Sequence, residues 1–112
     1  MPHCVVELSQ DLASHQTALV QDLFKVAAAS GLFKQDYDIK VRSQVYTTYT
    51  VGNTSDSFVY VGFSLLAGRT PEQKKTLSEA IKTLLITRFP DQKNLSLSVN
   101  VIDMDAGSYW KN

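Results

Sequence analysis

The chain begins with the stretch Met1-Pro2-His3-Cys4-Val5-Val6-Glu7-Leu8. From residue 3 to residue 9 the side chains alternate, with Cys4, Val6 and Leu8 on one face, which is typical of a β-strand that buries one side. Pro2 stands directly before this strand, and a small residue at that position permits removal of the initiator Met. Pro2 would then be a free secondary amine, which no internal residue can offer.

The next two segments predict a helix and a strand. Residues 11–30 carry apolar side chains at the 3.6-residue period, with Ser9 or Asp11 as a possible N-cap and Gly31 where a left-handed C-terminal residue belongs. Residues 39–50 are rich in β-branched and aromatic side chains and predict the longest strand, with Arg42 on its polar face.

The second half repeats this order. Residues 58–66 predict a strand that could be buried on both faces, after a turn cluster at 52–56. Thr70-Pro71-Glu72-Gln73 is a capping box with a proline at the first helical position, and Pro90 ends the helix. Its expected buried stripe comprises Leu77, Ala80, Ile81, Leu84 and Leu85. Residues 95–103 alternate as a last strand.

The order β-α-β, β-α-β predicts an α+β fold in one domain of residues 1–112, with halves of about 1–52 and 53–112. Strands joined by a helical crossover pair in parallel, so two such units side by side make a four-stranded mixed sheet with both helices on one face. The other face would be partly apolar and uncovered. We therefore expect copies of the chain to associate.

Composition and charge argue against nucleic-acid and membrane partners. Lys plus Arg and Asp plus Glu are 11 each, so the net charge is zero and no nucleic-acid partner is expected. The one cysteine, Cys4, cannot form an internal disulfide, which favours a reducing, cytoplasmic location. No apolar run approaches the roughly 18 residues of a membrane span, and no leader is visible, so we expect a mature N-terminus and no membrane partner.

Three residues are candidates for chemistry. Pro2 is a candidate base, because burial and neighbouring cations lower an amine's pKa toward neutrality. Arg42 and Arg69 could each hold a carboxylate, and Arg69 precedes a helix N-terminus that favours anions. His3 and His15 lack paired ligands and make a weak metal site, whereas Cys4 fits a small core residue.

These residues together resemble a known family. The opening Met-Pro-His with its strand, then Val41-Arg42-Ser43-Gln44-Val45, then Ala67-Gly68-Arg69-Thr70 before a capped helix, is similar to 5-carboxymethyl-2-hydroxymuconate isomerases of the tautomerase superfamily. The resemblance runs from Met1 to about Asp103. The second half is also similar to the short 4-oxalocrotonate tautomerase subunit.

The resemblance implies a fold, an assembly and a mechanism. The family builds trimers of duplicated β-α-β units, and its amino-terminal proline moves a proton between carbons of small unsaturated keto or dicarboxylic acids, in aromatic catabolism. By position, Pro2 would be the base, and Arg42 and Arg69 would bind the substrate, some of them from a neighbouring subunit. No cofactor or metal is implied. Val59 falls where the second half would need its own proline, so one chain offers one catalytic amine.

Other classes stay open from the residues. A non-catalytic binding or scaffold protein could use a tautomerase fold or a ferredoxin-like fold, which has the same element order. A dehalogenase or decarboxylase of the superfamily would need an additional acid or water-activating residue, for which the sequence places no candidate. Tyr109 and Trp110 in the tail could pack on a neighbour, line the site or lie free.

Overall fold

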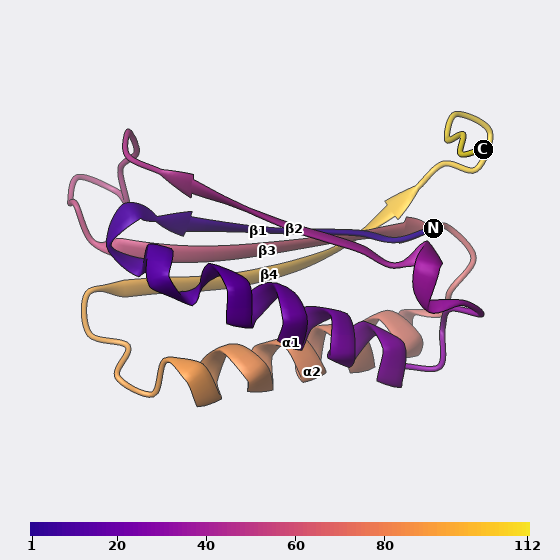
Figure 1. Cartoon of the computed structure of the whole chain (residues 1–112), viewed down its shortest axis with the longest axis horizontal. Helices are drawn as coiled ribbons and strands as arrows, with labels where there is room; N and C mark the ends of the chain where they lie inside the picture. The colour runs from indigo at the N-terminus through magenta and orange to yellow at the C-terminus, as the bar shows by residue number, and fades with distance from the viewer.

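A computed structural model describes residues 1–112 and shows one four-stranded sheet with two helices against one face (Figure 1). The strands are β1 (His3–Ser9), β2 (Lys40–Tyr46), β3 (Ser57–Leu66) and β4 (Leu95–Met104), and the helices are α1 (Gln16–Ala29) and α2 (Pro71–Arg88). Two short 3-10 segments, Gln10–His15 and Asp36–Asp38, precede α1 and β2. The predicted α+β fold with a mixed sheet is confirmed.

The sheet order is β2-β1-β3-β4. Within each half the two strands are parallel, since β1 pairs with β2 and β3 pairs with β4 across the crossover helices. The halves join through antiparallel pairing of β1 with β3, in which Val6 lies opposite Val61. The two central strands are therefore one from each half, and the amino terminus lies in the middle of the sheet.

The core lies between the sheet and the helices. Cys4, Val6 and Leu8 of β1 are completely buried, as their alternation predicted. The fully or nearly fully buried partners from the other elements are Leu19, Leu23, Ala27, Val59, Val61, Phe63, Leu65, Leu77, Ile81 and Leu85. These side chains occupy one face of the two central strands and one stripe of each helix, so the core fixes which sheet face stays open.

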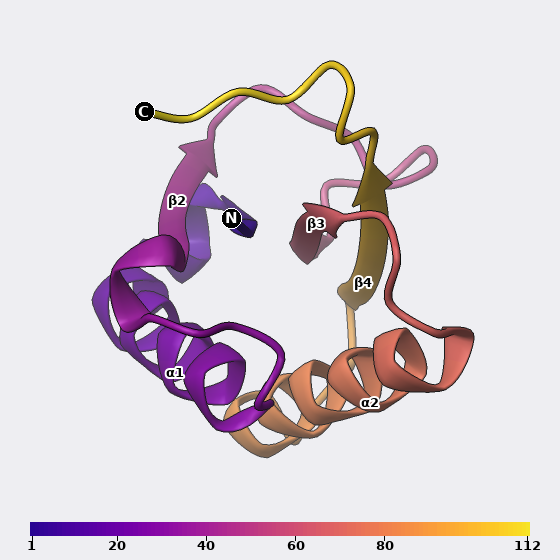
Figure 2. The ribbon, with the colours of Figure 1, turned by 90° about the vertical axis from the view of Figure 1, so that its right-hand side faces the viewer.

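An end-on view shows what lies on the open face (Figure 2). The helices lie on one side of the sheet, and the tail after β4 crosses the other side from β4 toward β2. That face is partly apolar, because Val5, Tyr60 and Ile102 lie there among polar residues. The tail covers only the end of the sheet that holds the amino terminus.

The start of the first helix differs from the prediction. Residues 10–15 form a 3-10 segment, and neither Ser9 nor Asp11 caps a helix. The Ser9 hydroxyl is buried and accepts a hydrogen bond from the Phe58 amide at 3.1 Å, whereas the Asp11 carboxylate accepts one from the Ser57 hydroxyl. Ser9 at the end of β1 and Asp11 in the 3-10 segment both bond to residues of β3, so they are unavailable as caps. Gly31 has a φ of 74°, as predicted.

Three further predictions were wrong in detail. The strand predicted over 39–50 ends at Tyr46, because its pairing partner β1 ends at Ser9. In this single chain the side chains of β3 are fully buried only on the helix-facing side, while on the other side Gly62 is buried and Phe58 and Tyr60 are half-buried. Ala80 is exposed rather than part of the buried stripe of α2. The capping box on Thr70 and Gln73 is present.

Candidate active site

Pro2 directly precedes β1, which is one of the two central strands, so it lies at one end of the sheet and midway across its width. Its side chain is almost completely buried, on the same face as Cys4. Its carbonyl accepts a hydrogen bond from the Lys40 amide at 3.2 Å, which extends the β1–β2 ladder by one residue. A proline is tolerated there because the strand begins after it and no N–H is needed. The fold therefore holds Pro2 rigidly.

The amino terminus lies among charged side chains. Burial lowers the pKa of the Met1 amine below its ordinary value, and Lys40, Arg69 and Lys111 lower it further, while Asp38 opposes them. Lys111 also approaches the Asp38 carboxylate, at 3.6 Å. Three cations from β2, the turn before α2 and the tail thus surround the amine that starts the chain.

Arg69 occupies the turn between β3 and α2. Its guanidinium donates to the carbonyls of Leu32 at 2.8 Å and Leu66 at 3.3 Å, and it lies 5.3 Å from the centroid of the Phe33 ring. The preceding Gly68 has a φ of 123°, a backbone conformation that side chains other than glycine rarely adopt. The turn therefore directs Arg69 back toward the loop after α1, at the amino-terminal end of the sheet.

Arg42 lies on the open face of β2. Its Nη1 is 3.1 Å from Nδ1 of His3, and Nε2 of His3 is 2.9 Å from the hydroxyl of Tyr109. Arg42 is exposed and has no other hydrogen bond. This chain of contacts connects β2, β1 and the tail on the face away from the helices.

The structure thus brings only part of the predicted site together within one chain. Arg69 acts on the amino terminus, whereas Arg42 is linked to Pro2 only through His3, the next residue along the chain. Sequence reasoning missed Lys40 and Lys111 as cations near the amine, and it left the role of Tyr109 open. Parallel pairing of the first two strands places Lys40 opposite His3, and an expected register would have indicated this neighbour. No local sequence pattern indicates that Lys111 lies near the amine.

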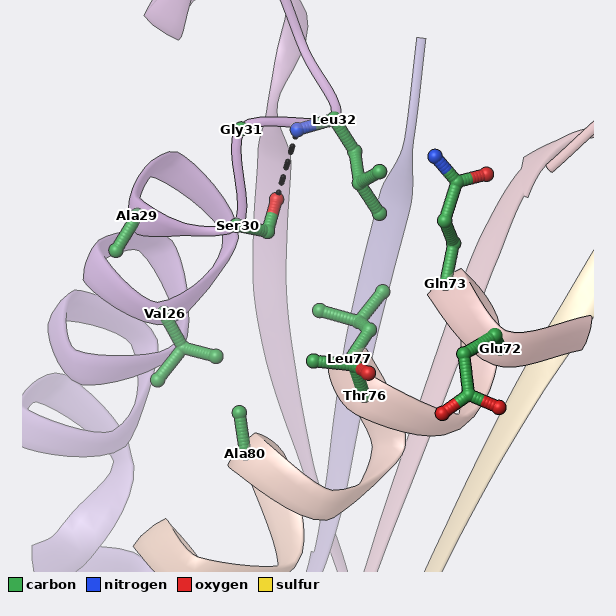
Figure 3. Close-up of a pocket in the computed structure, with 10 residues that line it drawn as sticks. All are labelled: Val26, Ala29, Ser30, Gly31, Leu32, Glu72, Gln73, Thr76, Leu77 and Ala80. Carbon is green, nitrogen blue, oxygen red and sulfur yellow. Dashed lines mark hydrogen bonds between the residues drawn. The ribbon is translucent and has the colours of Figure 1, made fainter. Parts of the chain in front are cut away.

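A groove of about 560 Å³ opens on the helical side at the same end of the molecule (Figure 3). It lies between the last turn of α1 and the first turns of α2, with apolar walls that include Val26, Leu32 and Leu77. The Leu32 carbonyl accepts the hydrogen bond from Arg69, so the groove adjoins the cationic end of the sheet.

Other reactive groups are confined to the core or scattered. Burial raises the pKa of the Cys4 thiol to about 12, so Cys4 is an inert core residue, as expected. No three His, Cys, Asp or Glu side chains cluster as a metal site would require. No helix of this chain has the length and apolar character needed to cross a membrane.

Several solved structures have the same architecture as this chain, and they identify its fold. A 5-carboxymethyl-2-hydroxymuconate isomerase from Deinococcus radiodurans R1 is similar, with a TM-score of 0.89, 25% identity, and 99% of this chain and 88% of that chain covered. A 5-carboxymethyl-2-hydroxymuconate delta-isomerase has a TM-score of 0.77 at 17% identity, with 100% and 87% covered. The fused 4-OT protein F6 has a TM-score of 0.75 at 19% identity, with 98% and 92% covered. The chain therefore has the tautomerase fold.

The family follows from the sequence. The family model described as 5-carboxymethyl-2-hydroxymuconate isomerase matches residues 2–112. The protein belongs to that family and is an isomerase. None of the curated proteins matches this chain.

Proposed function

We propose that the protein, after loss of Met1, is a cofactor-independent tautomerase that uses Pro2 as its general base. The substrate class is a small unsaturated keto or dicarboxylic acid, such as 5-carboxymethyl-2-hydroxymuconate, handled in the cytoplasm. Arg69 and Arg42 bind its carboxylate and carbonyl groups. Membership of the isomerase family supports the reaction type.

One observation carries the role of Pro2, namely that it is buried next to an amino terminus whose pKa three cations lower. The Met1 amine is already partly shielded from water, and burial together with Lys40, Arg69 and Lys111 lowers its pKa. Pro2 lies one residue deeper and is almost completely buried. An amine at Pro2 would experience the same cations with more burial, which favours the neutral form that a base requires.

The mechanism follows from that arrangement. The neutral Pro2 nitrogen accepts a proton from a carbon, or from the enol hydroxyl, of the substrate. The electron pair left behind is delocalised toward the substrate oxygen, where arginine side chains stabilise the developing charge. The protonated amine then returns the proton to another carbon of the same substrate. The product therefore has the same atoms as the substrate and differs only in the position of one proton and of the double bonds.

Intact-mass measurement and enzyme kinetics test whether Pro2 is the general base. We expect loss of Met1 and turnover of 2-hydroxymuconate or phenylenolpyruvate in an ultraviolet assay, with Pro2→Ala reduced by about 100-fold or more, the usual range for loss of a positioned base. An added residue that blocks Met removal is the matched control, since it leaves the side chain of Pro2 in place but converts its amine to an imide. Equal rates for wild type and Pro2→Ala would leave only a binding or scaffold role.

We further propose a homotrimer in which Arg42 completes the site of a neighbouring copy. Arg42 lies on the open face, away from Pro2 of its own chain, and the similar F6 fused 4-OT protein is a trimer. The partly apolar open face offers a surface on which copies can pack.

Mixed oligomers test this sharing. Pro2→Ala and Arg42→Ala chains, each inactive alone, are refolded together in equal amounts. If the site is shared, about a quarter of the sites receive both intact residues and activity returns, because each symmetric interface draws its two chains at random. No recovery in mixed oligomers would place Arg42 and Pro2 in the same chain's site instead.

A further inference from the structure

His3 follows Pro2 directly and points to the opposite face of the sheet, where it contacts two other parts of the chain. Nδ1 of its ring is 3.1 Å from Nη1 of Arg42 on β2. Nε2 is 2.9 Å from the hydroxyl of Tyr109 in the tail, and the two rings meet edge to face with centroids 5.8 Å apart. The His3 ring is half-buried.

The chemistry of these partners fixes the tautomer of His3. A guanidinium has only donors, so Nδ1 must accept its hydrogen bond. The ring is therefore neutral with its hydrogen on Nε2, and Nε2 donates to the Tyr109 hydroxyl. The contact with Arg42 therefore decides the tautomer, and the Tyr109 hydroxyl, which can donate or accept, is compatible with it.

The charges around His3 favour this neutral form. Arg42 and Lys40 face it from β2, the amino terminus faces it from its own strand, and Tyr109 faces it from the tail, while β3 places the neutral Ser64 opposite it. Burial lowers the pKa of His3 below its ordinary value, and Arg42, Lys40 and the amino terminus lower it further. Nδ1 therefore remains an acceptor near neutral pH.

The contact with His3 orients Arg42 while leaving it able to bind a ligand. One of five guanidinium N–H groups bonds to His3, and the others have no partner in this chain. A fork of two parallel N–H groups therefore remains for a carboxylate. The tail is held at the same place, because Tyr109 bonds to His3 and Lys111 approaches Asp38, with the exposed Trp110 between them.

We propose that His3 and Tyr109 are positioning residues for Arg42. The neutral His3 ring anchors the guanidinium through Nδ1, and Tyr109 holds the ring in place through its hydrogen bond to Nε2. This inference rests on the proposed function, in which Arg42 binds a substrate carboxylate. It adds that substrate affinity depends on the protonation of His3 and on the attachment of the tail, because a proton on Nδ1 ends the bond with Arg42.

A double-mutant cycle on binding tests the proposal without requiring turnover. The dissociation constant of 2-hydroxymuconate is measured by calorimetry in a Pro2→Ala background, with His3→Ala, Arg42→Ala and the two combined. We expect His3→Ala to weaken binding about three- to tenfold, as for loss of one hydrogen bond. In an Arg42→Ala chain the same change should have no further effect, because His3 acts through Arg42. Additive losses would overturn the proposal.

The pH profile and conservative variants give readouts that a purely structural role would not move. Wild-type affinity should weaken as the pH falls through the pKa of His3, whereas His3→Gln should restore an acceptor and remove this dependence. Tyr109→Phe should weaken binding by a smaller factor, and nitrogen NMR of the wild type should show the hydrogen of the His3 ring on Nε2. His15→Gln, at a histidine that packs on Phe89, is the control and should retain the wild-type profile. An unchanged profile in His3→Gln, or a wild-type His3 ring with its hydrogen on Nδ1, would overturn the proposal.

The two proposals fail in different ways. Equal turnover by wild type and Pro2→Ala would refute the base while the binding cycle still decides the role of His3. An additive cycle with an inactive Pro2→Ala would refute only the positioning role. Absence of turnover by the wild type together with absence of binding to Pro2→Ala would refute both.

Discussion

Replacing Arg69 with Ala should destabilise the protein as well as impair its activity. The guanidinium connects the turn before α2 to the loop after α1, through bonds of 2.8 Å to Leu32 and 3.3 Å to Leu66. It also lies over Phe33, whose ring stacks on the buried Phe63 at 5.9 Å. These contacts connect the two halves at the end of the sheet that holds Pro2.

The loss of unfolding free energy in Arg69→Ala can be worked out from these contacts. The shorter charged hydrogen bond contributes about 1.5 kcal/mol and the longer one about 0.5 kcal/mol. The stacking on Phe33 adds about 0.5–1 kcal/mol. Their sum is about 2.5–3 kcal/mol of unfolding free energy, which for a chain of 112 residues lowers Tm by about 11–13 °C. Arg69→Lys keeps the charge but not the fork, so about half of the loss should remain.

Calorimetry at one fixed protein concentration measures the stability, because an oligomer's Tm depends on concentration. Under the proposed function, kcat/KM should fall about 10- to 150-fold in Arg69→Ala. The control is Arg88→Ala, at the far end of α2, where a partly exposed ion pair with Asp22 contributes about 1 kcal/mol or less. A Tm within 2 °C of wild type in Arg69→Ala would refute the structural role, and an unchanged kcat/KM would refute its role in binding.

Three further outcomes follow from local contacts. Thr70→Ala removes the hydroxyl that accepts from the Gln73 amide at 3.1 Å and should cost about 1 kcal/mol in urea unfolding, whereas Thr70→Ser should cost much less. Cys4 should resist an aromatic disulfide reagent until the protein unfolds, since burial raises its pKa to about 12; rapid labelling of the native protein would contradict this burial. Hydrogen bonds from Ser57 and Ser9 lower the pKa of the Asp11 carboxyl, so this contact stabilises the fold above the unfolded pKa and is lost as pH falls through the folded one. Carbon NMR of Ser57→Ala should show the Asp11 pKa raised toward its ordinary value, and an unmoved pKa would exclude that hydrogen bond.

Much of the fold could be predicted because its signals are local. The alternation of Cys4, Val6 and Leu8 predicts a strand with one buried face, and the structure buries all three completely. The capping residues Thr70 and Gln73 mark the start of α2 within the sequence itself. Each signal needs only neighbours a few residues away, so it can be recognised without knowing the tertiary structure.

The misplaced boundaries have the opposite cause. Ser9 and Asp11 have the composition of helix caps, but both side chains bond to residues of β3 instead. The strand after residue 39 has β-forming residues as far as 50, but it ends where its partner β1 ends. Contacts between residues about 40 to 50 positions apart decide these boundaries, and local propensity carries no record of them.

The same division holds for the candidate site. The sequence by itself determined that a proline opens an apolar strand and that arginines lie mid-strand and before a helix, because these are matters of order and spacing. Only the tertiary structure decided that Arg69 acts on the amino terminus while Arg42 bonds to His3 on the other face. It also brought Lys111 and Tyr109 from the tail to the first strand. The physical reason is that pairing β1 with both β2 and β3 brings chain segments remote in sequence to one end of the sheet, where their charges act on a single amine.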